Sequence, residues 1–174
     1  MLKRKIDKYL EEWKASVDKK PLIVKGARQV GKTASIRYFG EKYYKYIVEI
    51  NFALQPKYKQ IFADGYEVDS IIKNITLLNP SLVVVPHETL LFFDELQEYP
   101  DCATSLKSFK QDGRYDVICS GSLMGLYYQQ IESNSVGYKT DYEMYSLDFE
   151  EFLWAKGYDE HLIDELYQHM VELK

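Results

Sequence analysis

The length, composition and charge of this chain are those of an ordinary globular protein. Its 174 residues suffice for one domain with a single core and are too few for two full domains. Hydrophobic residues make up 46% of the chain and charged residues 28%, and the formal net charge is −5. This acidic balance argues against a broad electrostatic grip on nucleic acid, although a local basic patch stays compatible with it.

The sequence lacks the patterns of secreted and membrane proteins. Residues 1–8 are too charged to form the apolar part of a secretory signal, and no later segment has the length needed to span a bilayer. Cys102 and Cys119 have no metal-ligand spacing and no nearby histidine, which predicts two free, buried thiols. We therefore expect a cytoplasmic protein without contact to a membrane.

The first predicted element is an amphipathic helix over residues 2–16, ahead of a break at Pro21. Its apolar residues recur at helical spacing and are Leu2, Ile6, Tyr9, Leu10 and Trp13. Lysines and glutamates lie between them. The simplest role of this stripe is to pack in the core.

The strongest functional motif follows a short apolar strand over Leu22–Lys25. It consists of Gly26, Ala27, Arg28, Gln29, Val30, Gly31, Lys32 and Thr33. The two glycines let the backbone turn and bring its N–H groups close to a polyphosphate. Lys32 adds a cation for the β and γ phosphates, and the Thr33 hydroxyl is placed to bind the Mg²⁺ that they carry. The motif predicts a loop that binds ATP phosphates; the alternative is a glycine-rich turn of accidental spacing.

A helix and a second strand follow the loop. The helix is predicted from Lys32 to about Phe39, with Gly40 as a left-handed C-terminal cap. The strand is predicted over Tyr44–Asn51. Strand, loop, helix and strand form one βαβ unit, so we expect a parallel sheet with a right-handed crossover. Beside such a loop, covering an adenine ring is a second interpretation of the apolar stripe of the first helix.

The middle of the chain is less informative. Residues 57–62 and 68–78 are predicted to be helical, and Asn79 and Pro80 end the second of these helices. Residues 81–85 are apolar enough for either an extended segment or a packed loop. The pattern does not decide between these two structures.

The second motif is the segment Thr89–Glu95, in which four apolar residues precede two acids. This pattern is typical of a buried strand that presents carboxylates at its C-terminal edge, where open α/β sheets bind ligands. Asp94 is a candidate to hold Mg²⁺ through water, and Glu95 to orient and deprotonate the attacking water. Alternatively, both acids are simply solvated where the strand leaves the core.

A third edge with polar residues follows a helix predicted over residues 101–110. The strand predicted over Tyr115–Ser120 ends in Ser120, Gly121 and Ser122. A hydroxyl at this position could contact the γ phosphate or the attacking water. Equally, Ser120 or Ser122 could cap a helix predicted over residues 123–131.

The chain from residue 132 onward is predicted to begin with a mobile, turn-rich loop over residues 132–140 and a fifth strand over 142–147. Asp148 and Glu151 resemble a capping box that opens a helix ending at Gly157. A final amphipathic helix is predicted over residues 161–173. These helices need a partner on which to pack, so we expect an ATPase domain over residues 1–147 and a helical extension over 148–174.

Together, the four motifs resemble the prokaryotic AAA-type ATPases, in particular the group with a Gly-Ala-Arg-Gln-x-Gly-Lys-Thr loop and a further C-terminal domain. The resemblance covers residues 4–155 and includes the run Leu147–Leu153. It implies a three-layer α/β/α P-loop fold with a mainly parallel five-stranded sheet. The sensor strand would lie between the phosphate-loop strand and the Asp94 strand.

The same resemblance implies roles for individual residues. Lys32 and Thr33 would hold phosphate and Mg²⁺, Asp94 would be the metal-site acid, and Glu95 the catalytic acid. Ser120 or Ser122 would be the sensor. The implied ligands are ATP, ADP and Mg²⁺, with a protein partner or self-association as a further expectation.

Two departures from the family pattern limit what can be transferred. Related chains often have Gly-Arg after the sensor helix, whereas here Tyr138 and Lys139 follow Gly137. The arginine that would act on the nucleotide of a neighbouring subunit is therefore not assigned, and Arg114 is a weak substitute candidate for it. Relatives also continue beyond the position of Leu153 into a lid-like region and a further domain. We therefore expect this chain to be either an ATPase-domain fragment or a shortened gene product.

Three functions compete on this basis. The first is an ATPase in which hydrolysis resets a switch read by the Ser120 edge and the loop 132–140. The second is a nucleotide-binding regulatory or interaction module with negligible turnover in isolation. The third, a small-molecule kinase, is disfavoured because adjacent acids at positions 94 and 95 suit the activation of water and no arginine-rich lid is visible.

Overall fold

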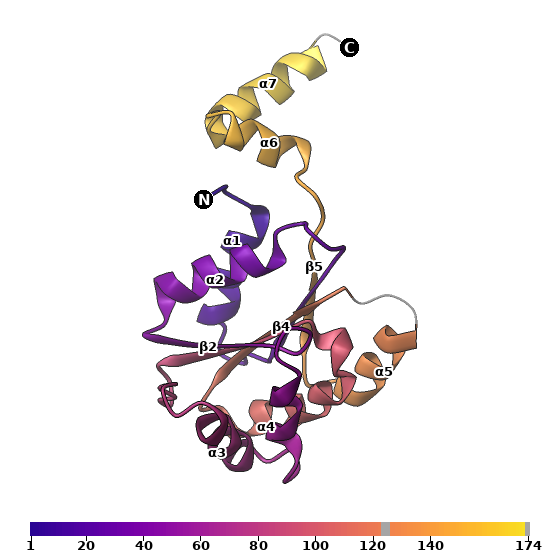
Figure 1. Ribbon diagram of the computed structural model, residues 1–174. Helices are drawn as coiled ribbons and strands as arrows, with labels where there is room; N and C mark the ends of the chain where they lie inside the picture. Colours follow the sequence, from indigo (N-terminus) through magenta and orange to yellow (C-terminus); the bar gives the residue numbers. More distant parts are fainter. Residues whose placement is uncertain (123–125, 173–174) are drawn as a thin grey trace.

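The protein is a three-layer α/β/α structure, seen here in a computed structural model that describes residues 1–122 and 126–172 (Figure 1). The five strands are β1 (Leu22–Lys25), β2 (Tyr46–Asn51), β3 (Thr89–Asp94), β4 (Asp116–Gly121) and β5 (Thr140–Glu143). They lie in the order β2-β3-β4-β1-β5, and every neighbouring pair is parallel. The predicted fold class is confirmed, as is the position of β4, the strand predicted to carry the sensor, between β1 and β3.

Helices cover both faces of this sheet. The α-helices are α1 (Lys5–Ala15), α2 (Lys32–Tyr43), α3 (Val68–Leu78), α4 (Ser105–Asp112), α5 (Leu126–Ser135), α6 (Phe149–Ala155) and α7 (Glu160–Glu172). Short 3₁₀ helices are η1 (Pro56–Phe62), η2 (Leu96–Glu98) and η3 (Pro100–Thr104). The start predicted for the helix after β4 lies outside the described residues. Residues 81–85, which the pattern left undecided, form a loop.

The alternation of side chains along β3 explains why the sheet needs helices on both faces. Leu90 and Phe92 are buried in the cluster that includes residues of α1 and α2, whereas Leu91 and Phe93 are buried in the cluster on the opposite face. All six residues of this strand are buried. A strand that buries both faces is an almost continuous apolar run, which is why the sequence predicted it correctly.

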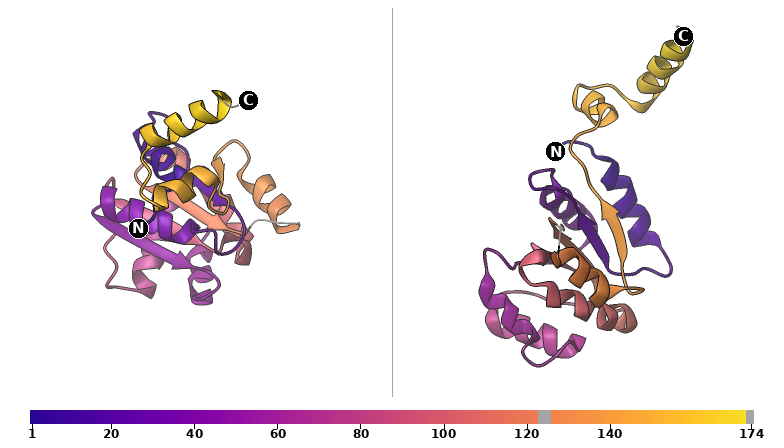
Figure 2. Two further views of the ribbon diagram at one scale, coloured as in Figure 1. Left: turned by 90° about the horizontal axis from the view of Figure 1, so that it is seen from above. Right: turned by 90° about the vertical axis from the view of Figure 1, so that its right-hand side faces the viewer.

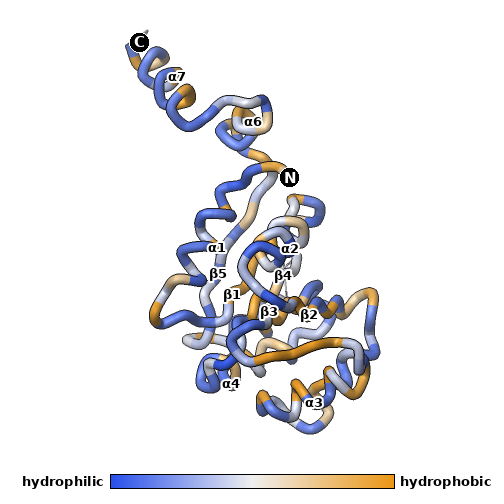
Figure 3. The backbone as a smooth tube through the Cα atoms, turned by 90° about the vertical axis from the view of Figure 1, so that its left-hand side faces the viewer, coloured by the Kyte–Doolittle hydropathy of each residue, from blue (hydrophilic) through white to orange (hydrophobic). Residues whose placement is uncertain are grey.

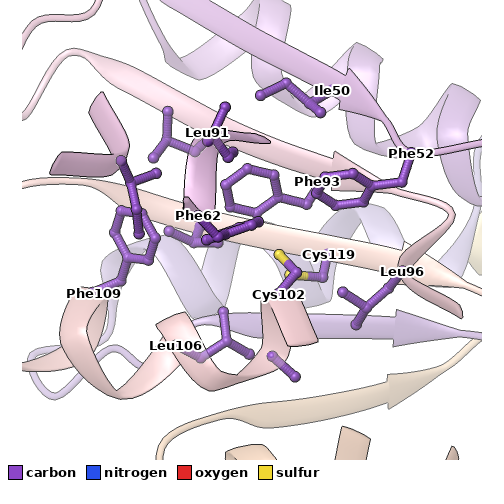
Figure 4. Packing of buried hydrophobic residues seen from close by; sticks show 14 of the residues in the cluster. Ile50, Phe52, Phe62, Leu91, Phe93, Leu96, Cys102, Leu106, Phe109 and Cys119 are labelled. Atoms are coloured by element: carbon purple, nitrogen blue, oxygen red, sulfur yellow. The ribbon is translucent and has the colours of Figure 1, made fainter. Parts of the chain in front are cut away.

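The larger of the two core clusters is rich in aromatic rings (Figure 4). Phe52 stacks on Phe93 with ring centroids 6.0 Å apart, and Phe62 lies 6.3 Å from Phe52. Cys102 and Cys119 lie in the same cluster as free, fully buried cysteines, as the sequence predicted. Burial raises the pKa of the Cys102 thiol, so these side chains serve as small apolar groups.

Helix α2 corrects one prediction, because it does not end at Gly40 but continues to Tyr43. Gly40 is instead buried between α2 and the sheet. A Cβ atom there would lie 2.8 Å from Ile47 Cδ1 and 3.1 Å from Leu90 Cδ2. The glycine therefore allows close approach of helix and sheet, since a side chain there would displace the ends of Ile47 and Leu90, and capping does not explain it.

The predicted mobile loop over residues 132–140 is also wrong in part. Helix α5 continues to Ser135, and β5 begins at Thr140, so the connection spans only residues 136–139. Because Thr140 pairs with Leu22 at the amino end of β1, this connection lies at the amino edge of the sheet. The phosphate loop follows the carboxyl end of β1, at the other edge.

Helices α6 and α7 project from the α/β body beside the N-terminus (Figure 2). The predicted capping box is present: the Asp148 carboxylate accepts from the Glu151 N–H at 2.8 Å, and the Asp148 N–H donates to the Glu151 carboxylate at 3.2 Å. The predicted apolar face of α6 is only partly buried, because Leu153 is buried whereas Phe149 and Phe152 are exposed. Helix α7 is mainly hydrophilic with separate hydrophobic positions (Figure 3).

Across residues 1–122 and 126–172, no helix combines the length and the apolarity that crossing a membrane would require.

Candidate functional site

The predicted site residues converge on the carboxyl edge of the sheet. The phosphate loop follows Lys25 at the end of β1, Asp94 is the last residue of β3, and Ser120 is the last residue but one of β4. Because β4 lies between β1 and β3, the ends of these three strands are neighbours. Open α/β sheets bind ligands at this edge.

Glycine is required at both ends of the phosphate loop. Gly26 has φ of 157°, and a Cβ atom there would lie 2.2 Å from the carbonyl oxygen of Met144. Gly31 has φ of 100° and serves as the N-cap of α2. The loop therefore combines left-handed backbone with contacts too close for a side chain, and the first N–H groups of α2, which have no intrahelical acceptor, follow it directly.

Lys32 lies across the loop. Its Nζ donates to the carbonyl oxygens of Gly26 at 2.8 Å and Ala27 at 2.5 Å. Burial lowers the pKa of the Lys32 ammonium, and the negative charges of Glu95 and Asp94 partly oppose this effect. The cation is thus held over the loop with two acids near enough to influence its titration.

Asp94 connects the loop to β4. The Thr33 hydroxyl donates to Asp94 Oδ2 at 3.0 Å, and the Ser120 hydroxyl donates to Asp94 Oδ1 at 2.6 Å. Asp94 and Ser120 are both buried. The structure thus brings together three residues that lie on β3, β4 and α2, as their sequence motifs predicted.

Glu95 occupies a strained position next to Asp94. Its backbone is left-handed, with φ of 56° and ψ of 50°, which is rare for a residue with a side chain. Its N–H donates to Asp94 Oδ1 at 2.8 Å. The Gln97 side chain makes two contacts: its Nε2 donates to Glu95 Oε2, and its Oε1 accepts from the Ser122 N–H at 3.2 Å. Gln97 therefore ties the Glu95 carboxylate to the end of β4.

The two serines considered as sensors have different surroundings. The Ser120 hydroxyl is fully buried and bonded to Asp94, whereas Ser122 lines the cavity in front of the loop. This cavity has a volume of about 590 Å³. Its remaining lining residues are Arg28, Gln29, Gly31, Lys32, Thr33, Ala34, Arg37, Ala53, Asp94, Glu95 and Glu98. It offers a concave space bordered by the loop, both acids and the first turn of α2.

The donor set fits Mg²⁺ in company with a nucleotide. Thr33 Oγ1 and Asp94 Oδ2 are hard oxygen donors 3.0 Å apart, the kind of ligand that Mg²⁺ prefers. Within the described part of the chain, no three His, Cys, Asp or Glu side chains are grouped to hold a metal by themselves. This set suits an ion that takes part of its shell from phosphate and water.

The contacts of two residues at the site, Gln97 and Arg4, are not predicted by the sequence. Gln97 lies two residues beyond the acidic motif Thr89–Glu95, and only the folded geometry shows that it contacts Glu95. Arg4 lies in the charged N-terminal run, yet its side chain is buried and donates to the Val30 carbonyl oxygen of the phosphate loop at 2.7 Å. A single arginine between two lysines gives no sequence signal for such burial.

Arg114, the weak substitute candidate, does not lie at this edge of its own sheet, and neither does Lys139, which stands near the position where relatives have arginine. Arg114 precedes β4 at the amino edge of the sheet and pairs with Asp112 at 2.8 Å and Asp69 at 2.6 Å. Lys139 precedes β5 at the same edge and pairs with Glu132 and Asp141, each at 2.5 Å. Both side chains are engaged in ion pairs on the side of the sheet opposite to the cavity.

One known protein family matches most of this chain. A family model described as an AAA domain matches residues 18–153. The chain belongs to the AAA domain family. As an AAA domain, it is a nucleotide-binding, ATPase-like module. No curated protein matches the sequence.

Solved structures similar to this AAA domain include PCH-2 of C. elegans, with 12% identity, a TM-score of 0.45 and coverage of 79% of this chain and 42% of that one. Another is the ORC1 protein of Aeropyrum pernix in complex with DNA, with 12% identity and a TM-score of 0.49. That match covers 82% of this chain and 44% of ORC1. This chain thus spans less than half the length of either structure.

Proposed function

We propose that this AAA domain binds Mg-ATP at the loop Gly26–Thr33 and hydrolyses it as a switch domain. The observation that carries the proposal is the contact of Thr33 Oγ1 with Asp94 Oδ2 at 3.0 Å. It brings a hydroxyl of the phosphate loop and a carboxylate from another strand within reach of one cation. A turn of accidental spacing would not require this convergence.

In this proposal, the loop residues Gly26–Gly31 supply backbone N–H groups to the phosphates, and Lys32 contacts the β and γ phosphates. Thr33 and Asp94 hold Mg²⁺, which neutralises developing charge on the phosphate oxygens when bound. Glu95 accepts a proton from the attacking water, and its fixed, left-handed backbone aims the carboxylate next to the metal-site acid.

The serine assignments follow from the surroundings of each side chain. Ser120 orients the Asp94 carboxylate, because its buried hydroxyl donates to Oδ1 and leaves Oδ2 for Thr33 and the cation. Ser122 lines the cavity and is the residue we assign to sensing the γ phosphate. The switch therefore acts through the carboxyl end of β4 and does not involve residues 132–140.

Phosphate release from Mg-ATP tests this function. Wild type should turn over, Glu95→Gln should bind ATP but hydrolyse it about 10²–10⁴ times more slowly, and Lys32→Ala should bind ATP about 100-fold more weakly. Arg114→Ala is the matched control at the opposite edge of the sheet and should behave as wild type. Equal rates in wild type and Glu95→Gln would rule out hydrolysis by this chain.

A second candidate is a nucleotide-binding module with negligible turnover in isolation. It is favoured by the hydrogen bond from Gln97 to Glu95, which occupies the proposed base. Tight ATP binding that Lys32→Ala weakens, together with equal background rates in wild type and Glu95→Gln, would support this second function.

A further inference from the structure

A buried arginine connects the phosphate loop to the C-terminal helices. The Arg4 side chain is only 8% exposed and makes three hydrogen bonds of 2.7 Å in three directions. NH1 donates to the Val30 carbonyl oxygen, Nε to Glu151 Oε2, and NH2 to the Tyr145 carbonyl oxygen. These acceptors belong to the loop, to α6 and to the chain just after β5.

The contact with the loop is close. A Cβ atom on Gly31 would lie 2.9 Å from Arg4 NH1, so the guanidinium packs directly on the last glycine before Lys32. The carbonyl oxygen of Met144 lies against Gly26 in the same way, at 2.2 Å from the place of a Cβ atom. The rear of the phosphate loop is therefore held at one end by Arg4 and at the other by the segment after β5.

The contact with α6 is equally specific. Glu151 is 6% exposed, and its Oε2 accepts from Arg4 Nε at 2.7 Å and from the Lys5 N–H at 2.9 Å. Its Oε1 accepts from the Asp148 N–H, which completes the capping box of α6. One carboxylate thus starts α6, neutralises Arg4 and binds the backbone at the start of α1.

The contacts of Glu151 with Arg4 and of Arg4 with Val30 form a relay between α6 and the loop. Glu151 holds Arg4, and Arg4 holds Val30, so the position of α6 and the shape of the loop depend on the same guanidinium. Only arginine presents donors in a planar fork that reaches three acceptors at once, and lysine would have to choose among them. The buried pair is formed by Arg4 and Glu151, so moving α6 away from Arg4 would leave an uncompensated charge behind the loop.

We propose that Arg4 is a positioning residue for the phosphate loop and that, through it, docking of α6 and nucleotide binding at the loop favour one another. The coupling rests on the proposed binding of nucleotide. Linkage requires it to be reciprocal: undocking α6 weakens nucleotide binding, and nucleotide stabilises docked α6. The helices that project from the body would thereby report the state of the loop.

The first test uses hydrogen exchange in the full chain without nucleotide. Arg4→Lys and Glu151→Gln should raise amide exchange in residues 28–32 about tenfold, a typical size for coupling between sites. Lys8→Ala is the matched control, because Lys8 pairs with Glu12 of the same helix at 4.0 Å on the surface and takes no part in the contacts between Arg4, the loop and α6. Unchanged exchange of residues 28–32 in Glu151→Gln would overturn the relay.

The second test measures the Kd of a fluorescent ATP analogue and the exchange of residues 149–155. Glu151→Gln should weaken binding about tenfold although Glu151 lies one contact away from the loop. The analogue should slow exchange of residues 149–155 in wild type and in Lys8→Ala, and less in Arg4→Lys. A lowered melting temperature with unchanged Kd in both variants would show that Arg4 is merely structural and overturn the proposal.

The two proposals can fail separately. Equal, negligible binding by wild type and Lys32→Ala would refute the nucleotide site and with it the coupling. In that event, the exchange of residues 28–32 in the nucleotide-free variants would still decide whether Arg4 and Glu151 position the loop.

Discussion

The two edges of the parallel sheet each hold a carboxylate, and the two are balanced in different ways. At the amino edge, Asp116 pairs with Lys19 at 3.0 Å and accepts from the Tyr44 hydroxyl at 2.5 Å, with Lys14 at 3.9 Å. At the carboxyl edge, Asp94 accepts from hydroxyl groups and from a backbone N–H, and within residues 1–122 and 126–172 no lysine or arginine nitrogen lies at ion-pair distance.

This difference distinguishes a carboxylate that is paired with lysines from the one that, in the proposed function, binds a cation. The lysines neutralise Asp116, so a cation would gain little there. Hydroxyl donors orient Asp94 without neutralising it, so its charge is retained for an incoming cation. We therefore expect substitutions at the carboxyl edge to change function, and those at the amino edge to change stability.

The largest expected effect is on turnover. Glu95→Gln should lower the rate of phosphate release about 10²–10⁴-fold with little change in ATP affinity, because the amide cannot accept the proton from water. Single-turnover phosphate release with a separate binding titration measures both quantities. A loss of rate of similar size in Arg114→Ala would break the comparison, because that residue lies at the amino edge.

Nucleotide affinity should show the next largest effect. Lys32→Ala should weaken ATP binding about 100-fold, since hydrogen bonds from a charged group contribute about 1.5–3 kcal/mol each. Equilibrium titration with a fluorescent ATP analogue measures the change. Lys19→Ala removes a cation of the same type at the amino edge and should bind as wild type, so a comparable loss there would contradict the assignment.

Exchanging each carboxylate for its amide sharpens the comparison directly. Asp116→Asn should lower the free energy of unfolding by about 1–2 kcal/mol, mainly through the weakened bond to Tyr44, because the two lysines are partly exposed. Asp94→Asn should change it by less than about 1 kcal/mol while it abolishes the dependence of ATP binding on Mg²⁺. Urea denaturation and Mg²⁺ titration measure the two quantities. The reverse pattern would refute the distinction between the edges.

The smallest effect concerns pH at the amino edge. Burial and the neighbouring Asp116 raise the pKa of Tyr44 well above 10. The unfolded chain releases this proton near pH 10 and the folded chain does not, so the stability is fully present below pH 10 and declines above it. Between pH 9 and 10.5 the loss amounts to about 0.8 kcal/mol. Urea denaturation across this range should show a smaller decline in Tyr44→Phe, and an identical decline would contradict the assignment.

The elements that the sequence predicted well are those whose signal is local. The strand Leu22–Lys25 and the helix Val68–Leu78 have the predicted bounds, because an apolar run and a helical period can be recognised in one segment. The capping box at Asp148 is local for the same reason. The strand order followed from the family resemblance, and neighbouring segments alone do not determine it.

What the sequence did not predict depends on partners that are distant in the chain. Gly40 is suited to either a helix end or a close approach, and only the positions of Ile47 and Leu90 decide between them. In the sequence, Arg4 resembles any residue of a charged terminus. Its burial depends on Val30 and Glu151, which are 26 and 147 positions away along the chain. The bond from Gln97 to Glu95 depends on a left-handed backbone that no residue type announces.

The position of Arg4 in the fold determines which fragments of this protein keep the contacts behind the phosphate loop. The region shared with the family begins at residue 18, so a fragment trimmed to residues 18–153 would begin after α1 and would lack Arg4. Such a fragment would also uncover Leu22 and Val24, whose cluster contains Ile6, Leu10 and Trp13 of α1. We expect it to aggregate and to bind nucleotide poorly, even though it would retain every residue of the phosphate loop.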